Sequence, residues 1–137
     1  MAVKDNHDIE GIPAYDFGMR PEQEDAVNKT IAYYKSADED PGTHIPKFLW
    51  NAKMRFGKTF ATYELAKRMG FKRILVLTFK PAVQSAWKAD LLSHKDFKGW
   101  QFISRSTDPG IPSINNQYDK TDKSRPIVCF GSFVNGK

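Results

Sequence analysis

Residues 52–59, Ala-Lys-Met-Arg-Phe-Gly-Lys-Thr, are the feature that most constrains what this chain can fold into. They fit the pattern of a phosphate-binding loop, with Ala52 at the first position, where glycine is commoner. Such a loop turns its backbone N–H groups inward and leads directly into the N-terminus of a helix. The N–H groups and the helix dipole together hold the oxygens of a polyphosphate. The pattern therefore predicts nucleotide binding at a loop that lies between a strand and a helix.

The residues that close this loop have separate expected roles. The Lys58 ammonium is expected to reach the outer phosphates, and it is the catalytic residue that we expect in this chain. The Thr59 hydroxyl is expected to ligate a Mg²⁺ ion carried by the nucleotide. Gly57 lets the backbone approach the phosphates closely, because it has no side chain. The expected cofactor-binding set within the loop is Ala52, Lys53, Met54, Arg55, Phe56, Gly57, Lys58 and Thr59.

Outside the loop, the sequence alternates between helical and strand patterns. Residues 74–77, Ile-Leu-Val-Leu, are a continuous apolar run typical of a strand buried on both faces. The alternation predicts an α/β fold with a mostly parallel sheet and helices on both faces, and the phosphate-binding loop at a carboxyl end of that sheet. The expected elements are a helix that starts at Pro21, strands over 48–50, 73–78, 100–104 and 127–130, and helices over 58–69 and 82–93.

Two segments are expected to lie outside this alternation. Residues 1–19 are polar with scattered aromatic side chains, and they are expected to form an N-terminal arm ahead of one domain over 20–137. Residues 105–125 are polar, rich in Ser, Asn, Asp and Pro, and show no periodicity. Such a composition predicts a flexible loop, because it offers too little apolar surface to fix a conformation.

Charge and cysteine content bound the partners and the compartment. The chain has 137 residues and a net charge of +5. This balance suits a polyanionic partner, although an ordinary mildly basic surface explains it equally well. No apolar run is long enough to span a membrane. Cys129 is the only cysteine, so a disulfide within the chain is excluded and a cytoplasmic location is expected.

A second motif, Arg20-Pro21-Glu22-Gln23, lies upstream of the phosphate-binding loop. Here the chain resembles the superfamily 2 helicases and translocases of the DEAD/DEAH type, whose R-P-x-Q segment opens a helix and whose Gln reads adenine. A primary amide suits that role, because its donor and acceptor match the N6/N7 edge of adenine. The resemblance implies that Arg20 and Gln23 complete an ATP site in a RecA-like lobe. Alternatively, Gln23 is a solvated helix residue.

The form of the loop carries the same resemblance further. Met54-Arg55-Phe56-Gly57-Lys58-Thr59 is similar to the version found in restriction-type and phage-type helicase domains, although Arg55 stands where the family often has glycine. Arg55 either adds positive charge near the phosphates or faces solvent. The analogy favours DNA as the partner, with RNA as the alternative.

A third resemblance covers residues 76–88, which are similar to the segment where a strand of that family ends in a proline-containing turn and starts a helix on the nucleic-acid backbone. The resemblance implies that Thr78, Lys80 and Pro81 contact phosphates, which fix register without reading bases. Ser132 resembles a later backbone-contacting position. Altogether the resemblance covers residues 15–133.

The acidic D-E-x-x motif that would hold Mg²⁺ and polarise water in such a motor does not occur after these segments. We therefore expect the ATP-binding front half of a helicase or translocase that does not hydrolyse ATP alone. Its expected partners are DNA and the remainder of the motor, meaning the rest of lobe one and lobe two. The alternatives are a non-catalytic nucleic-acid-binding domain with a degenerate nucleotide site, or a small P-loop kinase.

Overall fold

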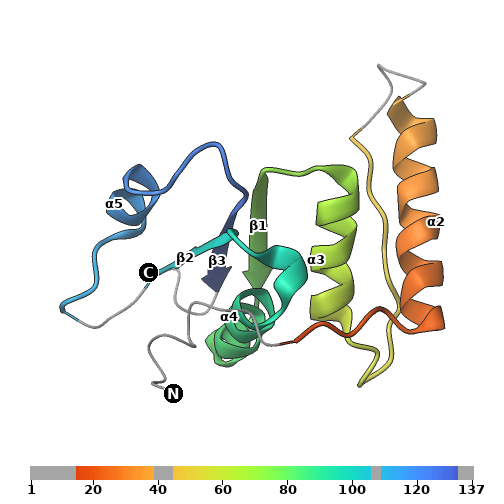
Figure 1. Ribbon diagram of the computed structural model, residues 1–137, viewed down its shortest axis with the longest axis horizontal. Helices are drawn as coiled ribbons and strands as arrows, with labels where there is room; N and C mark the ends of the chain where they lie inside the picture. Colours follow the sequence, from red (N-terminus) through yellow and green to blue (C-terminus); the bar gives the residue numbers. More distant parts are fainter. Residues whose placement is uncertain (1–14, 39–44, 106–108, 133–137) are drawn as a thin grey trace. The chain divides into compact units, whose positions relative to one another are not determined.

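The computed structural model describes residues 15–38, 45–105 and 109–132 (Figure 1). Most of the expected N-terminal arm, residues 1–14, lies outside the described residues. The chain divides into two compact units. The helical unit is Phe17–Met69, and the sheet unit comprises Gly70–Lys137 together with Met1–Asp16.

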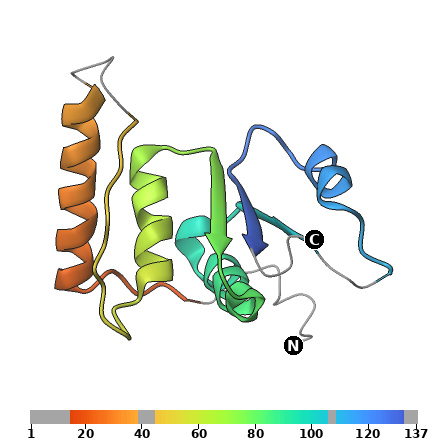
Figure 2. The same cartoon turned by 180° about the vertical axis from the view of Figure 1, so that it is seen from behind.

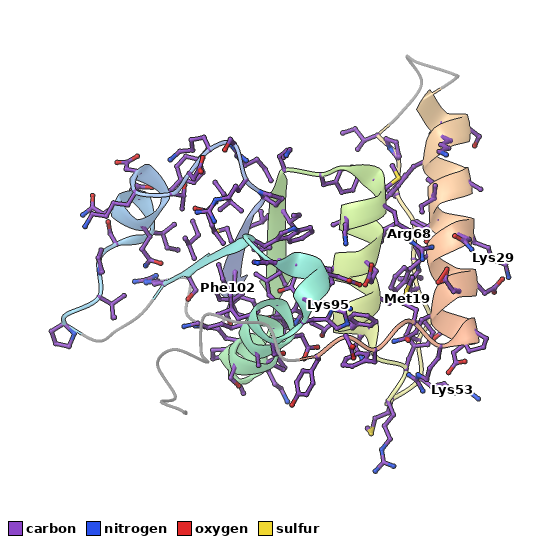
Figure 3. The ribbon with its side chains drawn as sticks, viewed as in Figure 1. Met19, Lys29, Lys53, Arg68, Lys95 and Phe102 are labelled. Atoms are coloured by element: carbon purple, nitrogen blue, oxygen red, sulfur yellow. The ribbon has the colours of Figure 1, made fainter. Side chains whose placement is uncertain are left out.

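The helical unit contains two helices, α2 (Pro21–Asp38) and α3 (Lys58–Met69). Segment 45–57 runs between them in both views (Figure 1, Figure 2). Arg68 of α3 contacts α2 through an ion pair of 2.8 Å with Glu24 (Figure 3). The expected helix over 58–69 is confirmed with the same bounds, and the helix that starts at Pro21 is confirmed as well.

Local chemistry explains where these helices begin and end. Pro21 occupies the first helical position, where its missing N–H costs nothing. The Gln23 amide oxygen accepts from the Arg20 N–H at 2.8 Å, which satisfies one of the donors left free at the start of α2. Gly70 ends α3 with φ +73°, a left-handed conformation in which a side chain is strained.

The strand expected over residues 48–50 is absent from the structure. Instead, side chains of α2 hold this segment: the Trp50 indole donates to the Thr30 hydroxyl at 2.7 Å, and the Phe48 ring packs against Tyr33. Leu49 is 88% exposed. The expectation of a buried strand over 48–50 was therefore wrong, because these apolar side chains pack against a helix and the segment pairs with no strand.

The sheet unit contains three parallel strands in the order β1-β3-β2. The first β-α-β connection runs through a 3₁₀ turn and a helix, and a second short helix precedes the last strand. The elements are β1 (Arg73–Thr78), η1 (Pro81–Val83), α4 (Gln84–Ser93), η2 (Lys95–Phe97), β2 (Gln101–Ser104), α5 (Ile114–Asp119) and β3 (Ile127–Ser132). The α/β class and the three expected strands in this unit are confirmed, and the expected helix over 82–93 forms as η1 followed by α4.

Burial differs between the central and the outer strands. β3 lies between its two neighbours, and its Val128 is fully buried. In β1, Val76 is buried, whereas Leu75 and Leu77 are 64% and 54% exposed. The expectation that residues 74–77 are buried on both faces was therefore wrong. β1 is an outer strand of the described sheet, and Leu75 and Leu77, which share one of its faces, show that this face lacks a complete cover.

The segment expected to be a flexible loop over 105–125 contains a helix instead. In its described part, Ser113 caps α5 by accepting from the Asn116 N–H at 3.2 Å. Gln117 of α5 donates to the Ser104 carbonyl at 2.8 Å, which attaches the helix to the end of β2. A polar composition hid this helix, because hydrogen bonds rather than an apolar stripe hold it.

None of the helices within the described residues is both long enough and apolar enough to cross a membrane. The cytoplasmic location stays a prediction.

Candidate phosphate-binding loop

The loop ahead of α3 turns sharply at two residues with positive φ. Phe56 N–H donates to the Lys53 carbonyl at 3.1 Å, which closes the turn. Arg55 has φ +69° and Gly57 has φ +80°. A side chain in the left-handed region costs about 1–2 kcal/mol, so Arg55 is held in a strained conformation. This geometry gives a physical reason why glycine suits the position that Arg55 occupies.

Two residues at the start of α2 bind the carbonyl groups of this loop. The Arg20 guanidinium donates to the carbonyls of Arg55, at 2.9 Å, and Phe56. The Gln23 amide nitrogen donates to the Gly57 carbonyl at 3.0 Å. We call Arg20 and Gln23 the carbonyl clamp, since three consecutive loop carbonyls are held by their side chains.

Gly57 is required for space as well as for conformation. A Cβ atom built on Gly57 would overlap the Gln23 amide nitrogen and would lie 3.3 Å from the Arg20 guanidinium. Gln23 is only 4% exposed, so its side chain has little room to move away. Glycine therefore lets the carbonyl clamp reach the loop backbone.

The carbonyl clamp also determines where the loop N–H groups point. A trans peptide directs the carbonyl of one residue and the N–H of the next in opposite directions. No described peptide bond is cis. With the carbonyls of Phe56 and Gly57 held by α2, the N–H groups of Gly57 and Lys58 therefore point away from α2. The N–H groups of Gly57 and Lys58 can therefore both donate to an anion on the side of the loop that faces away from α2.

The start of α3 adds further donors on that side. The first N–H groups of any helix have no acceptor within the helix. In α3 these include the N–H groups of Lys58 and Thr59, while the Ala61 N–H already donates to the Gly57 carbonyl at 3.1 Å. The Lys58 side chain is exposed and Thr59 is half-buried. The predicted loop residues thus lie together at one helix N-terminus.

A hollow of about 610 Å³ lies beside the loop, within the helical unit. Its aromatic wall contains Trp50 and Phe56, whose ring centroids are 6.0 Å apart. Lys53 and Arg55 also line it, and within the described residues neither forms an ion pair. Figure 3 labels Lys53 on the loop and Lys29 on α2. The hollow therefore combines aromatic surface with uncompensated positive charge.

The structure shows what the Gln23 amide contacts within the helical unit, whereas its expected contact with adenine stays a prediction. Its amide oxygen accepts from Arg20 and its amide nitrogen donates to Gly57, so both ends of the amide are engaged within the unit. The sequence predicts that Arg20 and Gln23 lie at the loop, but it does not predict that their side chains bind the loop carbonyls. No local pattern reports such bonds, because the partners lie more than thirty positions apart.

The four residues expected to contact nucleic acid belong to the sheet unit. Thr78 and Ser132 lie side by side at the carboxyl ends of β1 and β3. The Thr78 hydroxyl donates to the Lys80 carbonyl at 3.0 Å, and the Ser132 hydroxyl donates to the Phe79 carbonyl at 3.2 Å. Pro81 begins η1 directly after them. The four residues thus lie together at the carboxyl ends of these strands, and the two hydroxyl groups donate to backbone carbonyls of the turn that follows β1.

Sequence comparison finds a similar curated protein in Mycoplasma pneumoniae, the putative type II restriction enzyme and methyltransferase RM.MpnORF110P C-terminus. It is 35% identical over 116 residues, which is 85% of this chain. The chain spans 14% of the length of that relative. No family model matches the chain. No solved structure matches it significantly.

These findings correct the function expected from the sequence. The relative is described as a restriction enzyme and methyltransferase, and that description contains no helicase or translocase. The structure also has no strand leading into loop 52–59. The expected helicase motor is therefore wrong, and nothing found supports a RecA-like lobe or further motor lobes as partners. The similarity to a restriction-type protein, which the form of the loop suggested, is supported.

Proposed function

We propose that this chain is a DNA-handling part of a restriction–modification protein and that loop 52–59 binds phosphate within it. The observation that carries the proposal is the carbonyl clamp. By holding the carbonyls of residues 55–57 on the side of α2, it turns the N–H groups of Gly57 and Lys58 the other way. The relative described as a restriction enzyme and methyltransferase supports the connection with DNA.

The chemistry of the loop suits a phosphate group. Backbone N–H groups at a helix N-terminus bind anions without requiring a counter-charge. Lys58 adds a mobile positive charge on the same short segment, and Lys53 and Arg55 add positive charge near the turn. The phosphate belongs either to a nucleotide such as ATP or to the DNA backbone. With ATP as the source, Thr59 is the residue that would ligate the accompanying Mg²⁺.

The test is equilibrium binding by the whole 137-residue chain. Inorganic triphosphate, ATP with and without Mg²⁺, and a short DNA duplex are titrated separately, by calorimetry for the first two and by fluorescence anisotropy for DNA. Lys58→Ala is the test variant. Lys35→Ala is the control, because Lys35 is an exposed lysine in the last turn of α2.

Triphosphate binding that Lys58→Ala weakens about tenfold, equivalent to about 1.4 kcal/mol, supports the proposal, provided that Lys35→Ala leaves it unchanged. Stronger binding of ATP than of triphosphate identifies a nucleotide as the source. A Lys58 effect on DNA affinity alone identifies the DNA backbone. If Lys58→Ala and the unmodified chain bind every ligand equally, the loop is not a phosphate site.

A further inference from the structure

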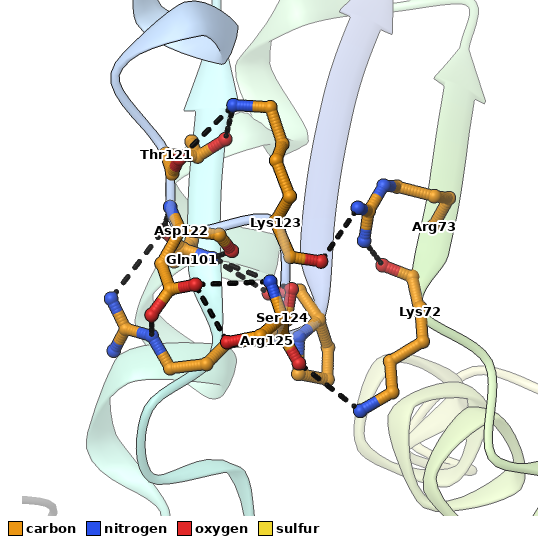
Figure 4. Close-up of polar contacts among 9 residues, drawn as sticks. Lys72, Arg73, Gln101, Thr121, Asp122, Lys123, Ser124 and Arg125 are labelled. Carbon is orange, nitrogen blue, oxygen red and sulfur yellow. Dashed lines mark hydrogen bonds and ion pairs between the residues drawn. The ribbon is translucent and has the colours of Figure 1, made fainter.

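A second group of basic side chains lies at the amino ends of the strands in the sheet unit. It surrounds residues 120–126, which link α5 to β3 and which we call the basic connector (Figure 4). Arg73 begins β1 beside it and Lys72 directly precedes that strand, whereas Lys123 and Arg125 belong to the connector itself. All four of these side chains are exposed.

The backbone of the connector is held in one conformation by polar contacts. The Gln101 amide accepts from the Asp122 N–H at 2.8 Å and donates to the Asp122 carbonyl at 2.9 Å. The Asp122 carboxylate accepts from the Ser124 hydroxyl at 2.6 Å and from the Ser124 N–H at 3.0 Å. These bonds hold the pKa of the Asp122 carboxyl below its ordinary value, so the group is charged at neutral pH. The connector is therefore ordered, although its sequence has no apolar periodicity.

Three of the cations are oriented by neutral acceptors. Arg73 donates to the Lys123 carbonyl at 2.8 Å, and Lys72 donates to the Ser124 carbonyl at 3.3 Å. The Lys123 ammonium donates to the Tyr118 carbonyl at 2.5 Å and to the Thr121 carbonyl and hydroxyl at 3.0 Å each, and it lies 4.5 Å from the centre of the Tyr118 ring. A carbonyl orients an ammonium or guanidinium group without cancelling its net charge.

Only one carboxylate among the described residues compensates this group through an ion pair. Asp122 pairs with Arg125 at 3.3 Å, and both side chains are about half exposed. The charges of Lys72, Arg73 and Lys123 are left uncompensated on a fixed surface. Because these side chains are already ordered, binding a ligand costs them less conformational entropy than it would cost freely rotating lysines.

We propose that Lys72, Arg73 and Lys123 form a surface that binds the phosphate backbone of duplex DNA. The inference rests on the proposed function for its link to DNA, but it uses residues of the sheet unit, apart from loop 52–59. It also differs from the sequence-based expectation, which placed backbone contacts at Thr78, Lys80, Pro81 and Ser132 on the carboxyl ends of the strands. Phosphate contacts of this kind carry no base specificity, so binding is sensitive to salt and tolerant of sequence.

The test measures the affinity of the whole chain for short duplexes of two unrelated sequences over a range of NaCl concentrations. The test variant is the double substitution Lys72→Gln and Lys123→Gln. Lys88→Gln is the matched control, because Lys88 is exposed on α4 of the same unit. Lys80→Gln tests the carboxyl-end surface. The double substitution of Lys72 and Lys123 to Arg retains the charge and is expected to restore binding.

Removal of two phosphate contacts is expected to weaken binding several-fold for both sequences and to reduce the slope of log K against log salt by about 1.8. Far-UV circular dichroism checks that the Gln variant is folded. An unchanged slope in a folded variant overturns the inference, and so does a loss confined to Lys80→Gln. The proposed function is judged separately by Lys58→Ala and triphosphate, so either conclusion can fail without the other.

Discussion

Loop 52–57 and the basic connector are both irregular segments whose backbone carbonyls accept hydrogen bonds from side chains. They differ in the groups that these contacts leave open, which are backbone N–H groups in the loop and cationic side chains at the connector. In the loop, Arg20 directs its charge to the carbonyls, and the N–H groups point to the other side. Beside the basic connector, Lys72 and Arg73 likewise donate to carbonyls, but neither has a carboxylate partner among the described residues, whereas Arg20 pairs with Glu22 at 3.2 Å. We therefore propose that the same type of contact serves a backbone anion site in one unit and a cationic surface in the other.

The largest expected effect tests the loop itself, by comparing Gly57 with Gly70, the glycine that ends α3. Gly57→Ala introduces left-handed strain and an overlap with Gln23, whereas Gly70→Ala introduces the strain alone, because nothing lies within 4 Å of its Cβ. Gly70→Ala is expected to lower the free energy of unfolding by about 1–2 kcal/mol. Gly57→Ala is expected to lower it further and to weaken triphosphate binding about tenfold. Urea unfolding and calorimetry measure the two effects.

Equal destabilisation by the two alanine variants, with triphosphate binding intact in both, would show that the carbonyl clamp does not shape the loop.

An intermediate effect is expected when the two glutamines are compared. Gln23→Ala leaves the Gly57 carbonyl and the Arg20 N–H without the Gln23 amide, at a position where Gln23 is only 4% exposed. The free energy of unfolding should fall by about 1–3 kcal/mol. Gln101→Ala removes similar bonds from a half-buried position that water can reach, so a loss of about 0.5–1.5 kcal/mol is expected. Denaturant titrations followed by circular dichroism compare the variants.

Should Gln101→Ala prove the more damaging substitution, burial is not what distinguishes the two segments.

The smallest effect concerns the ion pair that joins α2 and α3. The hydrogen bond from Arg68 holds the pKa of the Glu24 carboxyl below its ordinary value of 4.5. A carboxyl with a lowered pKa stabilises the folded state above its unfolded pKa, and this stabilisation disappears as the pH falls through the folded value. Glu24→Gln should therefore be less stable than the unmodified chain at pH 7, with the difference shrinking below pH 4.5.

Unfolding titrations at pH 7 and below pH 4.5 measure how much less stable Glu24→Gln is than the unmodified chain. The same substitution in an Arg68→Met background serves as the control. A Glu24→Gln effect that persists unchanged in that background would show that the ion pair is not its cause.

Local sequence predicted the elements whose causes are local. The helix over 58–69 was predicted with its bounds, since Gly70 ends it by a backbone preference that belongs to the residue itself. The run of residues 127–130 was correctly predicted as a buried strand. The run of residues 48–50 looked equally apolar, but its partners turned out to be Thr30 and Tyr33 on a helix. Apolar composition alone does not say which partner buries a segment.

The candidate site divides in the same way. The sequence identified the loop residues and the two residues, Arg20 and Gln23, that lie beside them. The contact between Gln23 and adenine stays a prediction, and the structure adds that both ends of the Gln23 amide contact the unit, at Arg20 and Gly57. The helicase function that the resemblance implied was wrong, because the similar protein found by comparison is described as a restriction enzyme and methyltransferase.

By itself, the sequence determined the α/β class, the position of α3 and the glycine that its loop requires, because each follows from propensities of residues close together in the chain. Three features come from the packing of distant segments: α2 holds the loop carbonyls, β1 is an outer strand, and four cations gather around residues 120–126. These features depend on contacts between residues more than thirty and, for β1 and the cations, more than fifty positions apart. Contacts over that distance are selected by the packing of the whole fold, and no local pattern records them.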